Sequence, residues 1–272
     1  MSLTVNVAVS VRGTCDIGAI KMRARRAAQG VLEFRTWGGK RKGAGRKPVE
    51  RPGEPPHRRV RKRARVTARE PVHVVIRVVP RVGTLRRRKA YQALRRALLT
   101  VLIRGRIRIV HISIQRRHVH LLVEAADERA LARGMQGFQI SAAKQLNAAL
   151  TVELRGRRTI GARALVRGQV FTSRYHAEII DTPRRARHCL AYVVNNWRRH
   201  REDLAGPAHR RAKVDPYSSA IAFDGWRDHA TPFAWPPGYE PLVVARARSW
   251  LLTEGWRRHG LVDLHEVPGA RC

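Results

Sequence analysis

The order of the periodic segments is the feature of this chain that most restricts its fold. From residue 71 onward, segments in which apolar and polar residues alternate are separated by segments with helical spacing. The predicted strands cover residues 71–79, 106–114, 118–125 and 168–180, and the predicted helices cover 85–103, 128–150 and 183–201. The order is therefore β-α-β-β-α-β-α. It predicts an α+β protein of the ferredoxin-like, split-βαβ type, an antiparallel sheet with helices on one face and the other face free.

The segment that precedes these elements has a composition that cannot form a core. Residues 37–69 combine glycine, proline and dense arginine and lysine with hardly an apolar residue. Folding would bury too little surface to offset the ordering of the chain, so we predict a basic flexible N-terminal arm over residues 1–69. The stretch "GRKP" contains Arg46 and Lys47 and is compatible with either a minor-groove DNA contact or a solvated basic linker.

The composition changes again near residue 202. Beyond it the stretches "DPYSSAIAFDGW" and "TPFAWPPGYEP" are rich in turn-forming and aromatic residues, and "LVVARARSWLLTEGWRRHGL" has helical spacing. We therefore predict a catalytic domain over residues 70–201 and a small C-terminal appendage over 202–272 that packs on it.

The charge of the chain restricts its partners. Lysine and arginine total 56 against 20 acidic residues, which gives a formal net charge of +36. Self-repulsion of this size does not stabilise a globular fold, so we expect the positive charge to bind a polyanion. Nucleic acid is the favoured polyanion, because neutralising its phosphates releases counterions. No apolar run approaches the roughly 20 residues that a spanning helix needs, so no membrane partner is expected.

The cysteines restrict the redox environment and the metal chemistry. Cys15, Cys189 and Cys272 are far apart in the sequence and form no Cys-x-x-Cys pair. A disulfide framework and a thiolate zinc site are therefore not expected, and a reducing cytoplasm fits. Any metal site in this chain must use nitrogen and oxygen ligands.

Two histidines share one face of the predicted strand "HVHLLVEA". Side chains alternate along a strand, so His118 and His120 point the same way, while Val119, Leu121 and Val123 form an apolar row on the other face. Imidazoles about 7 Å apart along a strand can converge on one metal ion or one phosphate. The alternative is a pair on a solvated face, or one histidine that is satisfied by a backbone carbonyl.

The last predicted helix carries a tyrosine off its apolar stripe. The stripe consists of Ala186, Leu190, Val193, Val194 and Trp197. Tyr192 lies roughly 200° round the helix from Leu190, and His188 and Asn196 share its side. Packing does not explain an exposed tyrosine in this place well, although an amphipathic tyrosine at a surface remains an alternative.

The two patterns gain a chemical meaning if they meet on the free face of the sheet. A divalent ion held by His118 and His120 needs an oxygen ligand, which Asn196 could supply. Tyr192 would then be a phenol beside a metal-polarised phosphate, and metal activation is what a phenol with a pKa of about 10 needs to become a nucleophile. The product would be a phosphotyrosine ester that retains the bond energy for rejoining strands.

These motifs resemble a known family. The stretches that carry the resemblance are "GGKRKGAGRKP", "RRHVHLLVEA", "GMQGFQISAAKQLNAAL", "GQVFTSRYHAEIIDTPRRARHCLAYVVNNWRRH", "DPYSSAIAFDGW" and "SWLLTEGWRRHGL", which together span roughly residues 35 to 262. A His-hydrophobic-His strand followed by a helix with Tyr-x-x-x-Asn is similar to the single-tyrosine HUH transposases that act on single-stranded DNA. Within them, the chain looks most like the REP-associated tyrosine transposases.

The resemblance implies a role for each candidate residue. It implies Tyr192 as the nucleophile, His118, His120 and Asn196 as metal ligands, and Mg²⁺ or Mn²⁺ as the cofactor. It also implies a 5′-phosphotyrosine intermediate with a free 3′-hydroxyl, a hairpin-forming single strand of DNA as the partner, a monomer or homodimer, and a place in the bacterial cytoplasm near the nucleoid. The candidates for DNA contact are Arg46, Lys47, Arg117, Arg174 and His176.

Two other classes of function stay open. A rolling-circle replication initiator or relaxase would share the histidine pair and the tyrosine, but it usually brings further catalytic motifs or a helicase domain. A pure DNA-binding protein, such as a domesticated transposase, would keep the basic surface and need no metal. Within the enzyme reading, Tyr175 is the rival nucleophile, and we expect it in the core because it shares a strand face with Phe171 and Ile179.

Overall fold

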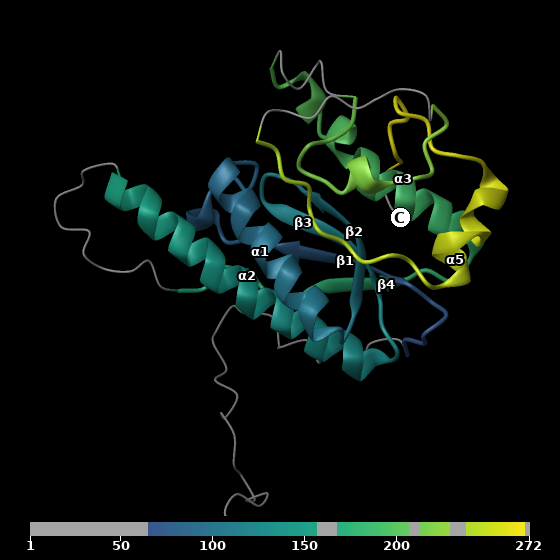
Figure 1. Ribbon diagram of the computed structural model, residues 1–272, viewed down its shortest axis with the longest axis horizontal. Helices are drawn as coiled ribbons and strands as arrows, with labels where there is room; N and C mark the ends of the chain where they lie inside the picture. Colours follow the sequence, from purple (N-terminus) through teal and green to yellow (C-terminus); the bar gives the residue numbers. More distant parts are fainter. Residues whose placement is uncertain (1–64, 157–167, 207–212, 229–237, 270–272) are drawn as a thin grey trace, which may run out of the picture. The chain divides into compact units, whose positions relative to one another are not determined.

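The order of strands and helices agrees with the sequence pattern. The computed structural model describes residues 65–156, 168–206, 213–228 and 238–269, all within one compact unit that spans Val60–Cys272. The strands are β1 (Val72–Arg77), β2 (Arg108–Ile114), β3 (His118–Glu124) and β4 (His176–Ile179). The helices are α1 (Arg88–Arg104), α2 (Glu128–Gly156), α3 (Pro183–Arg199) and the short α5 (Trp250–Thr253), as Figure 1 shows.

The four strands form one antiparallel sheet in the order β2-β3-β1-β4. This order is that of the split-βαβ fold, so the predicted fold class is confirmed. The histidine-bearing strand β3 and strand β1 lie at the centre of the sheet. Val75 of β1 stands opposite His120 of β3 on one side and His176 of β4 on the other.

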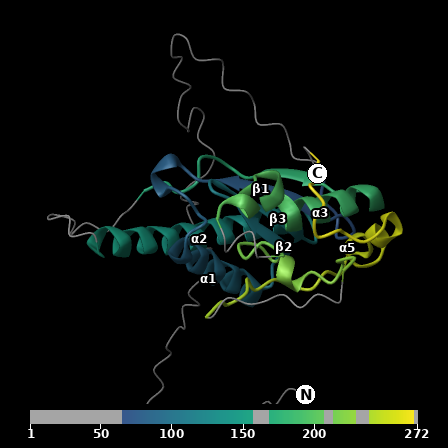
Figure 2. The ribbon, with the colours of Figure 1, turned by 90° about the horizontal axis from the view of Figure 1, so that it is seen from above.

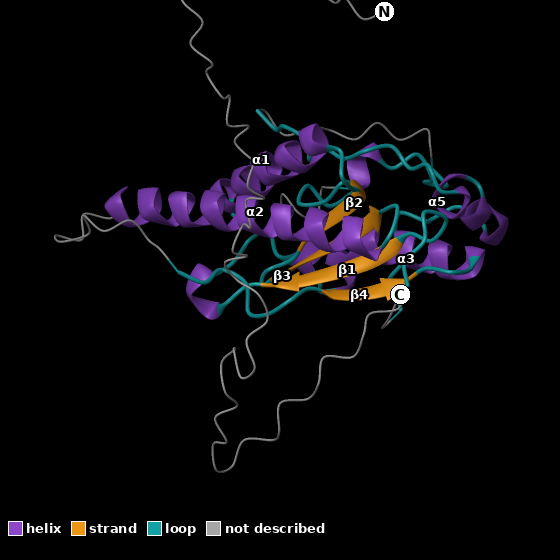
Figure 3. Ribbon diagram, turned by 90° about the horizontal axis from the view of Figure 1, so that it is seen from below, coloured by secondary structure: helices purple, strands orange, loops and turns teal. Residues whose placement is uncertain are grey.

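One face of the sheet packs against α1 and α2, which lie side by side (Figure 3). The row Val119, Leu121 and Val123 belongs to this core, as the alternation in β3 predicted. The predicted core stripe of α2 is also confirmed: Leu131, Met135, Phe138, Ala142 and Leu146 are all buried. Helix α1 ends at Arg104 because Gly105 adopts a left-handed conformation with φ of 61° and returns its N–H to the carbonyl of Val101. Because Val119, Leu121 and Val123 face this core, His118 and His120 point to the opposite face of the sheet.

The opposite face is partly covered by α3 and the C-terminal segment, which lie together in Figure 2. Thr182 accepts a hydrogen bond from the backbone N–H of Arg185 and Pro183 follows it, so the predicted start of α3 is confirmed. Val110 and Leu122 of the sheet form a second core with four residues of the predicted stripe of α3, namely Ala186, Leu190, Val193 and Val194. The sequence predicted this face of the sheet to be free of helices, but α3 packs on part of it through the second core.

The C-terminal segment contributes to the fold rather than only covering it. Residues 215–219 follow the outer edge of β2, where Ser218 bridges Ser113 and the N–H of Ser219 donates to the carbonyl of Ile112. Trp226 and Trp256 are buried in the core that contains α3. No helix in the described part of the chain is both long and apolar enough to cross a membrane.

Among the boundaries that differ from the sequence expectation, two change which residues belong to the sheet and its core. The strand expected over 168–180 is reduced to β4, because residues 172–174 form a bend and Phe171 makes only a single bridge to Val78. The packed part of the chain also begins before residue 70, since Val66 is buried in the main core and Thr67 bridges Asp127. The division into arm, catalytic domain and appendage otherwise stays a prediction.

Candidate functional site

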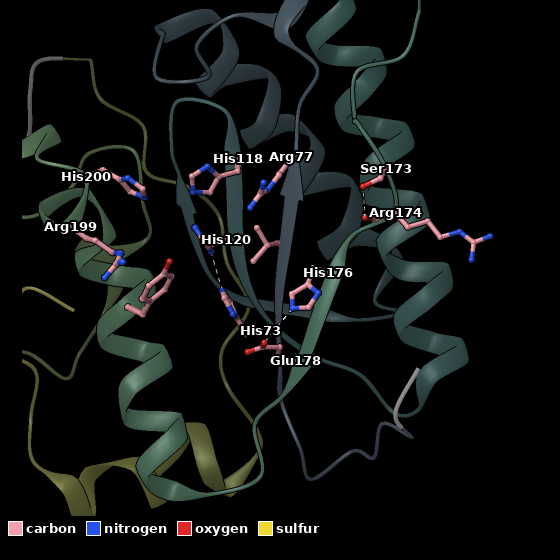
Figure 4. Close-up of a pocket in the computed structure, with 12 residues that line it drawn as sticks. His73, Arg77, His118, His120, Ser173, Arg174, His176, Glu178, Arg199 and His200 are labelled. Carbon is pink, nitrogen blue, oxygen red and sulfur yellow. Dashed lines mark hydrogen bonds and ion pairs between the residues drawn. The ribbon is translucent and has the colours of Figure 1, made fainter. Parts of the chain in front are cut away.

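A pocket of about 860 Å³ opens on the sheet face that α1 and α2 leave free (Figure 4). Side chains from β1, β3, β4 and the C-terminal half of α3 line it. On the central strands, the residues that line the pocket alternate with the residues that face the main core. The pocket is therefore a direct consequence of strand alternation and of the position at which α3 crosses the sheet.

His118 and His120 lie in this pocket, as the sequence predicted. Their ring centroids are 4.7 Å apart. Burial, together with smaller effects of the neighbouring His200 and Arg77, lowers the pKa of His118 from 6.5 to about 4. Burial likewise holds the pKa of His120 well below its usual value. Both imidazoles are therefore neutral at pH 7, which is the form that can bind a metal ion.

A third histidine, which was not among the residues predicted from the sequence, lies beside this pair. His73 lies on β1, and its Nε2 is 3.1 Å from Nδ1 of His120 in a buried hydrogen bond. Burial lowers the pKa of His73 to about 4, against the opposing effect of Glu178. The available signal was the alternation of "PVHVVIRVV", which puts His73, Val75 and Arg77 on the face opposite the apolar row.

Tyr192 faces the histidines from α3. Its ring centroid is 5.1 Å from that of His120 and 5.8 Å from that of His73, and in both contacts the rings meet edge to face. The tyrosine is half-buried and lines the pocket. The rival candidate Tyr175 is buried in the main core, as expected.

Asn196 lies elsewhere than the sequence suggested. We expected it on an exposed side of α3, but its side chain is fully buried and it is not among the residues that line the pocket. The adjacent residues Asn195 and Trp197 are fully buried as well, so this turn of α3 is enclosed by the fold. Both amide atoms of Asn196 lack a hydrogen-bond partner within the described residues. Its role as a metal ligand stays a prediction.

The pocket is rich in positive charge and in groups that can become positive. Arg77, Arg199 and His200 line the pocket, and the ring centroids of His118 and His200 are 5.4 Å apart. The one carboxylate in the lining is that of Glu178, which pairs with His176 at 3.3 Å. This balance favours an anionic ligand such as a phosphodiester.

The predicted DNA contacts are distributed over three places. Arg174 and His176 belong to the pocket lining, although Figure 4 shows the Arg174 side chain extending away from the histidines. Arg117 is exposed in the turn between β2 and β3. Arg46 and Lys47 lie outside the described residues.

One observation supports the binding of a divalent cation by these histidines. Nε2 of His120 is buried and has no hydrogen-bond partner within the described residues, so a ring lone pair is available inside the pocket. In the described ranges no three histidine, cysteine or acidic side chains are grouped closely enough to hold a metal by themselves. Protein nitrogen ligands would therefore be few, and oxygen ligands from substrate, water or an amide must complete the coordination shell.

The site combines paired histidines on a central strand with a tyrosine on the helix that crosses it. Residues 68–196 match the family model described as "Transposase IS200 like". The matched segment contains all three histidines of the cluster as well as Tyr192. The match confirms that this segment is similar to the IS200-like transposases, as the sequence motifs indicated.

Two solved structures are similar to the chain. One is a REP-associated tyrosine transposase bound to a REP hairpin, with 16% identity, a TM-score of 0.38, and coverage of 51% of this chain and 72% of that chain. The other is a protein assigned as a transposase from Deinococcus radiodurans R1, with 14% identity, a TM-score of 0.32, and coverage of 44% and 86%. The comparison with curated proteins gives no match.

Proposed function

We propose that this protein is a metal-dependent transposase that cuts and rejoins single-stranded DNA at hairpin-forming elements, with Tyr192 as its nucleophile. The family supports the transposase activity, and the sequence motifs resemble those of the REP-associated group. The observation that carries the mechanism is the contact between Tyr192 and His120, whose ring centroids are 5.1 Å apart in a basic pocket.

The chemical step is a transesterification. The Oη atom of Tyr192 attacks the phosphorus of a phosphodiester and forms a new P–O bond, while the bond to the 3′-oxygen of the preceding nucleotide breaks. The products are a 5′-phosphotyrosine and a free 3′-hydroxyl, and the phenol proton is passed to the departing oxygen or to solvent. Attack by another 3′-hydroxyl reverses the step and joins strands, because no bond energy has been lost to hydrolysis.

Each group around the tyrosine has a task in this step. Arg77 and Arg199 compensate the charge of the phosphodiester as it enters the pocket. His118 and His120 would hold the cation through neutral ring nitrogens, and the two unpartnered amide atoms of Asn196 support its choice as a further ligand. A bound Mg²⁺ or Mn²⁺ would polarise the phosphoryl oxygen and favour loss of the phenol proton.

The test is to map the covalent adduct. The full chain is incubated with a labelled hairpin oligonucleotide and Mn²⁺, and the peptide left on the DNA is identified by mass spectrometry. We expect the adduct on Tyr192, its loss in Tyr192→Phe, and its persistence in the matched variant Tyr175→Phe. An adduct on Tyr175, or one that survives Tyr192→Phe, would refute the assignment. Hairpin binding without any adduct would favour a DNA-binding protein instead.

A further inference from the structure

We infer that His73 is a positioning residue that fixes the ring of His120 in the one tautomer able to bind a cation. This inference rests on the proposed metal site and deepens it. In that tautomer the proton is on Nδ1 of His120, which donates to Nε2 of His73, and Nε2 of His120 keeps its lone pair for the pocket. His73 would act through His120 and would not itself be a ligand of the cation.

The strand register brings the two histidines together. His73 of β1 stands opposite Leu122 of β3, and His120 stands opposite Val75, so the histidines are diagonal neighbours on the same face. Diagonal neighbours in an antiparallel pair are within reach of long or aromatic side chains. The two rings are nearly parallel, with 8° between their planes, and their nitrogens are 3.1 Å apart. Both residues are about 95% buried, at 5% and 4% exposure, so water does not compete for the hydrogen bond.

The surroundings of His120 decide the direction of the hydrogen bond. A neutral imidazole has one N–H and one lone pair. If His73 donated, the proton of His120 would be on Nε2, where it would be a buried N–H without a partner among the described residues. Buried N–H groups without a partner are rarer and more costly than unfilled lone pairs. The favoured arrangement therefore has His120 donating through Nδ1.

The consequence for the site is orientational. Metal-bound histidines commonly donate their other ring nitrogen to a fixed acceptor, which holds both the tautomer and the ring plane. Here the acceptor is another histidine on the neighbouring central strand. The ring of His73 also meets the ring of Tyr192 edge to face, with 5.8 Å between their centroids. His73 therefore contacts both the candidate metal ligand His120 and the candidate nucleophile Tyr192.

The experiment compares three substitutions in the full chain. His73→Leu removes the acceptor, and His73→Gln restores one through its amide oxygen. His111→Gln is the matched control. His111 lies on β2 and is buried on the same face of the sheet as His73, it forms a hydrogen bond with Ser219 at 3.1 Å, and it is not among the residues that line the pocket. The first readout is the tautomer of His120 in the metal-free protein, from ¹H–¹⁵N correlation spectra of histidine-labelled samples. The second is the affinity for Mn²⁺ alone, from electron paramagnetic resonance titration.

We expect the Nδ1–H tautomer of His120 in the wild type and in His73→Gln, and its loss or mixing in His73→Leu. Mn²⁺ affinity should fall about 10- to 100-fold in His73→Leu, the range typical of lost outer partners of metal ligands, and stay within about threefold of wild type in His73→Gln and His111→Gln. An Nε2–H tautomer in the wild type, or full Mn²⁺ affinity in folded His73→Leu, would overturn the inference. A wild type that binds no Mn²⁺ would instead overturn the proposed metal site, and the tautomer measurement would still decide the role of His73.

Discussion

Replacement of Asp215 by alanine should destabilise this protein more than most single substitutions, because the carboxylate is one half of a buried ion pair. Asp215 is fully buried, and its two oxygens accept hydrogen bonds from the guanidinium of Arg86 at 2.9 and 3.0 Å. The Arg86 side chain is 5% exposed, and its charged end lies 4.6 Å from the ring centre of Tyr217. Without Asp215 the buried guanidinium would keep the carbonyl of Ile114 and, as its carboxylate partner among the described residues, the more distant Glu202 at 3.8 Å.

The magnitude follows from the cost of an uncompensated buried charge. Breaking a buried ion pair by removing one partner costs about 3–5 kcal/mol, and Glu202 should keep the loss at the lower end of this range. For a domain of about 200 residues, each kcal/mol lowers the melting temperature by about 2–4 °C, so we expect a decrease of roughly 6–15 °C. Urea unfolding followed by circular dichroism measures the free energy directly.

Two further variants make this prediction specific. The double variant Arg86→Met/Asp215→Leu removes both charges and should recover a large part of the lost free energy, since an apolar pair of similar size is often tolerated. Asp224→Ala breaks an ion pair with Arg257 in which the Asp224 side chain is 83% exposed, and it should cost less than about 1 kcal/mol. A loss below about 1 kcal/mol in Asp215→Ala, equal to that of Asp224→Ala, would refute the reasoning.

Three other predictions concern metal, pH and the basic arm. His118→Ala should abolish Mn²⁺-dependent cleavage while leaving hairpin affinity within a few-fold, because phosphate contacts supply most of the affinity; cleavage at the wild-type rate in EDTA would contradict this. Burial lowers the pKa of His111 to about 4, so the unfolded chain takes up its proton first, near pH 6.5. Stability should therefore fall from pH 6.5 toward pH 4 by up to about 1.4 kcal/mol per pH unit for this group, and His111→Gln should flatten a plot of unfolding free energy against pH. Deleting residues 1–64 should weaken hairpin binding and reduce its salt dependence but leave cooperative unfolding intact; an unchanged salt slope would show that the arm does not contact DNA.

The sequence was sufficient for those parts of the fold and site that depend on periodicity. Alternation in β3 placed His118 and His120 on the face opposite Val119 and Leu121, and the structure brings both histidines into the pocket. Helical spacing separated Tyr192 from the buried stripe of α3, and the helix then carries the tyrosine to within 5.1 Å of His120. In each case one local pattern decides the direction of the side chain, and no knowledge of distant segments is needed.

Contacts between distant segments account for what the sequence did not predict. The burial of Asn196 depends on contacts with the rest of the fold, and no pattern within "YVVNNWRRH" indicates them. The contact of His73 with His120 depends on the register of β1 against β3, which is set by the whole sheet. The motif "DPYSS" was selected as a family feature, and the structure gives its first residue a physical task, since Asp215 binds the buried Arg86, whose Nη1 also donates to the carbonyl at the end of β2. Arg86 also lies near Glu202, just beyond the end of α3. The buried guanidinium of Arg86 therefore connects the β2–β3 hairpin, which carries His118 and His120, to α3, which carries Tyr192.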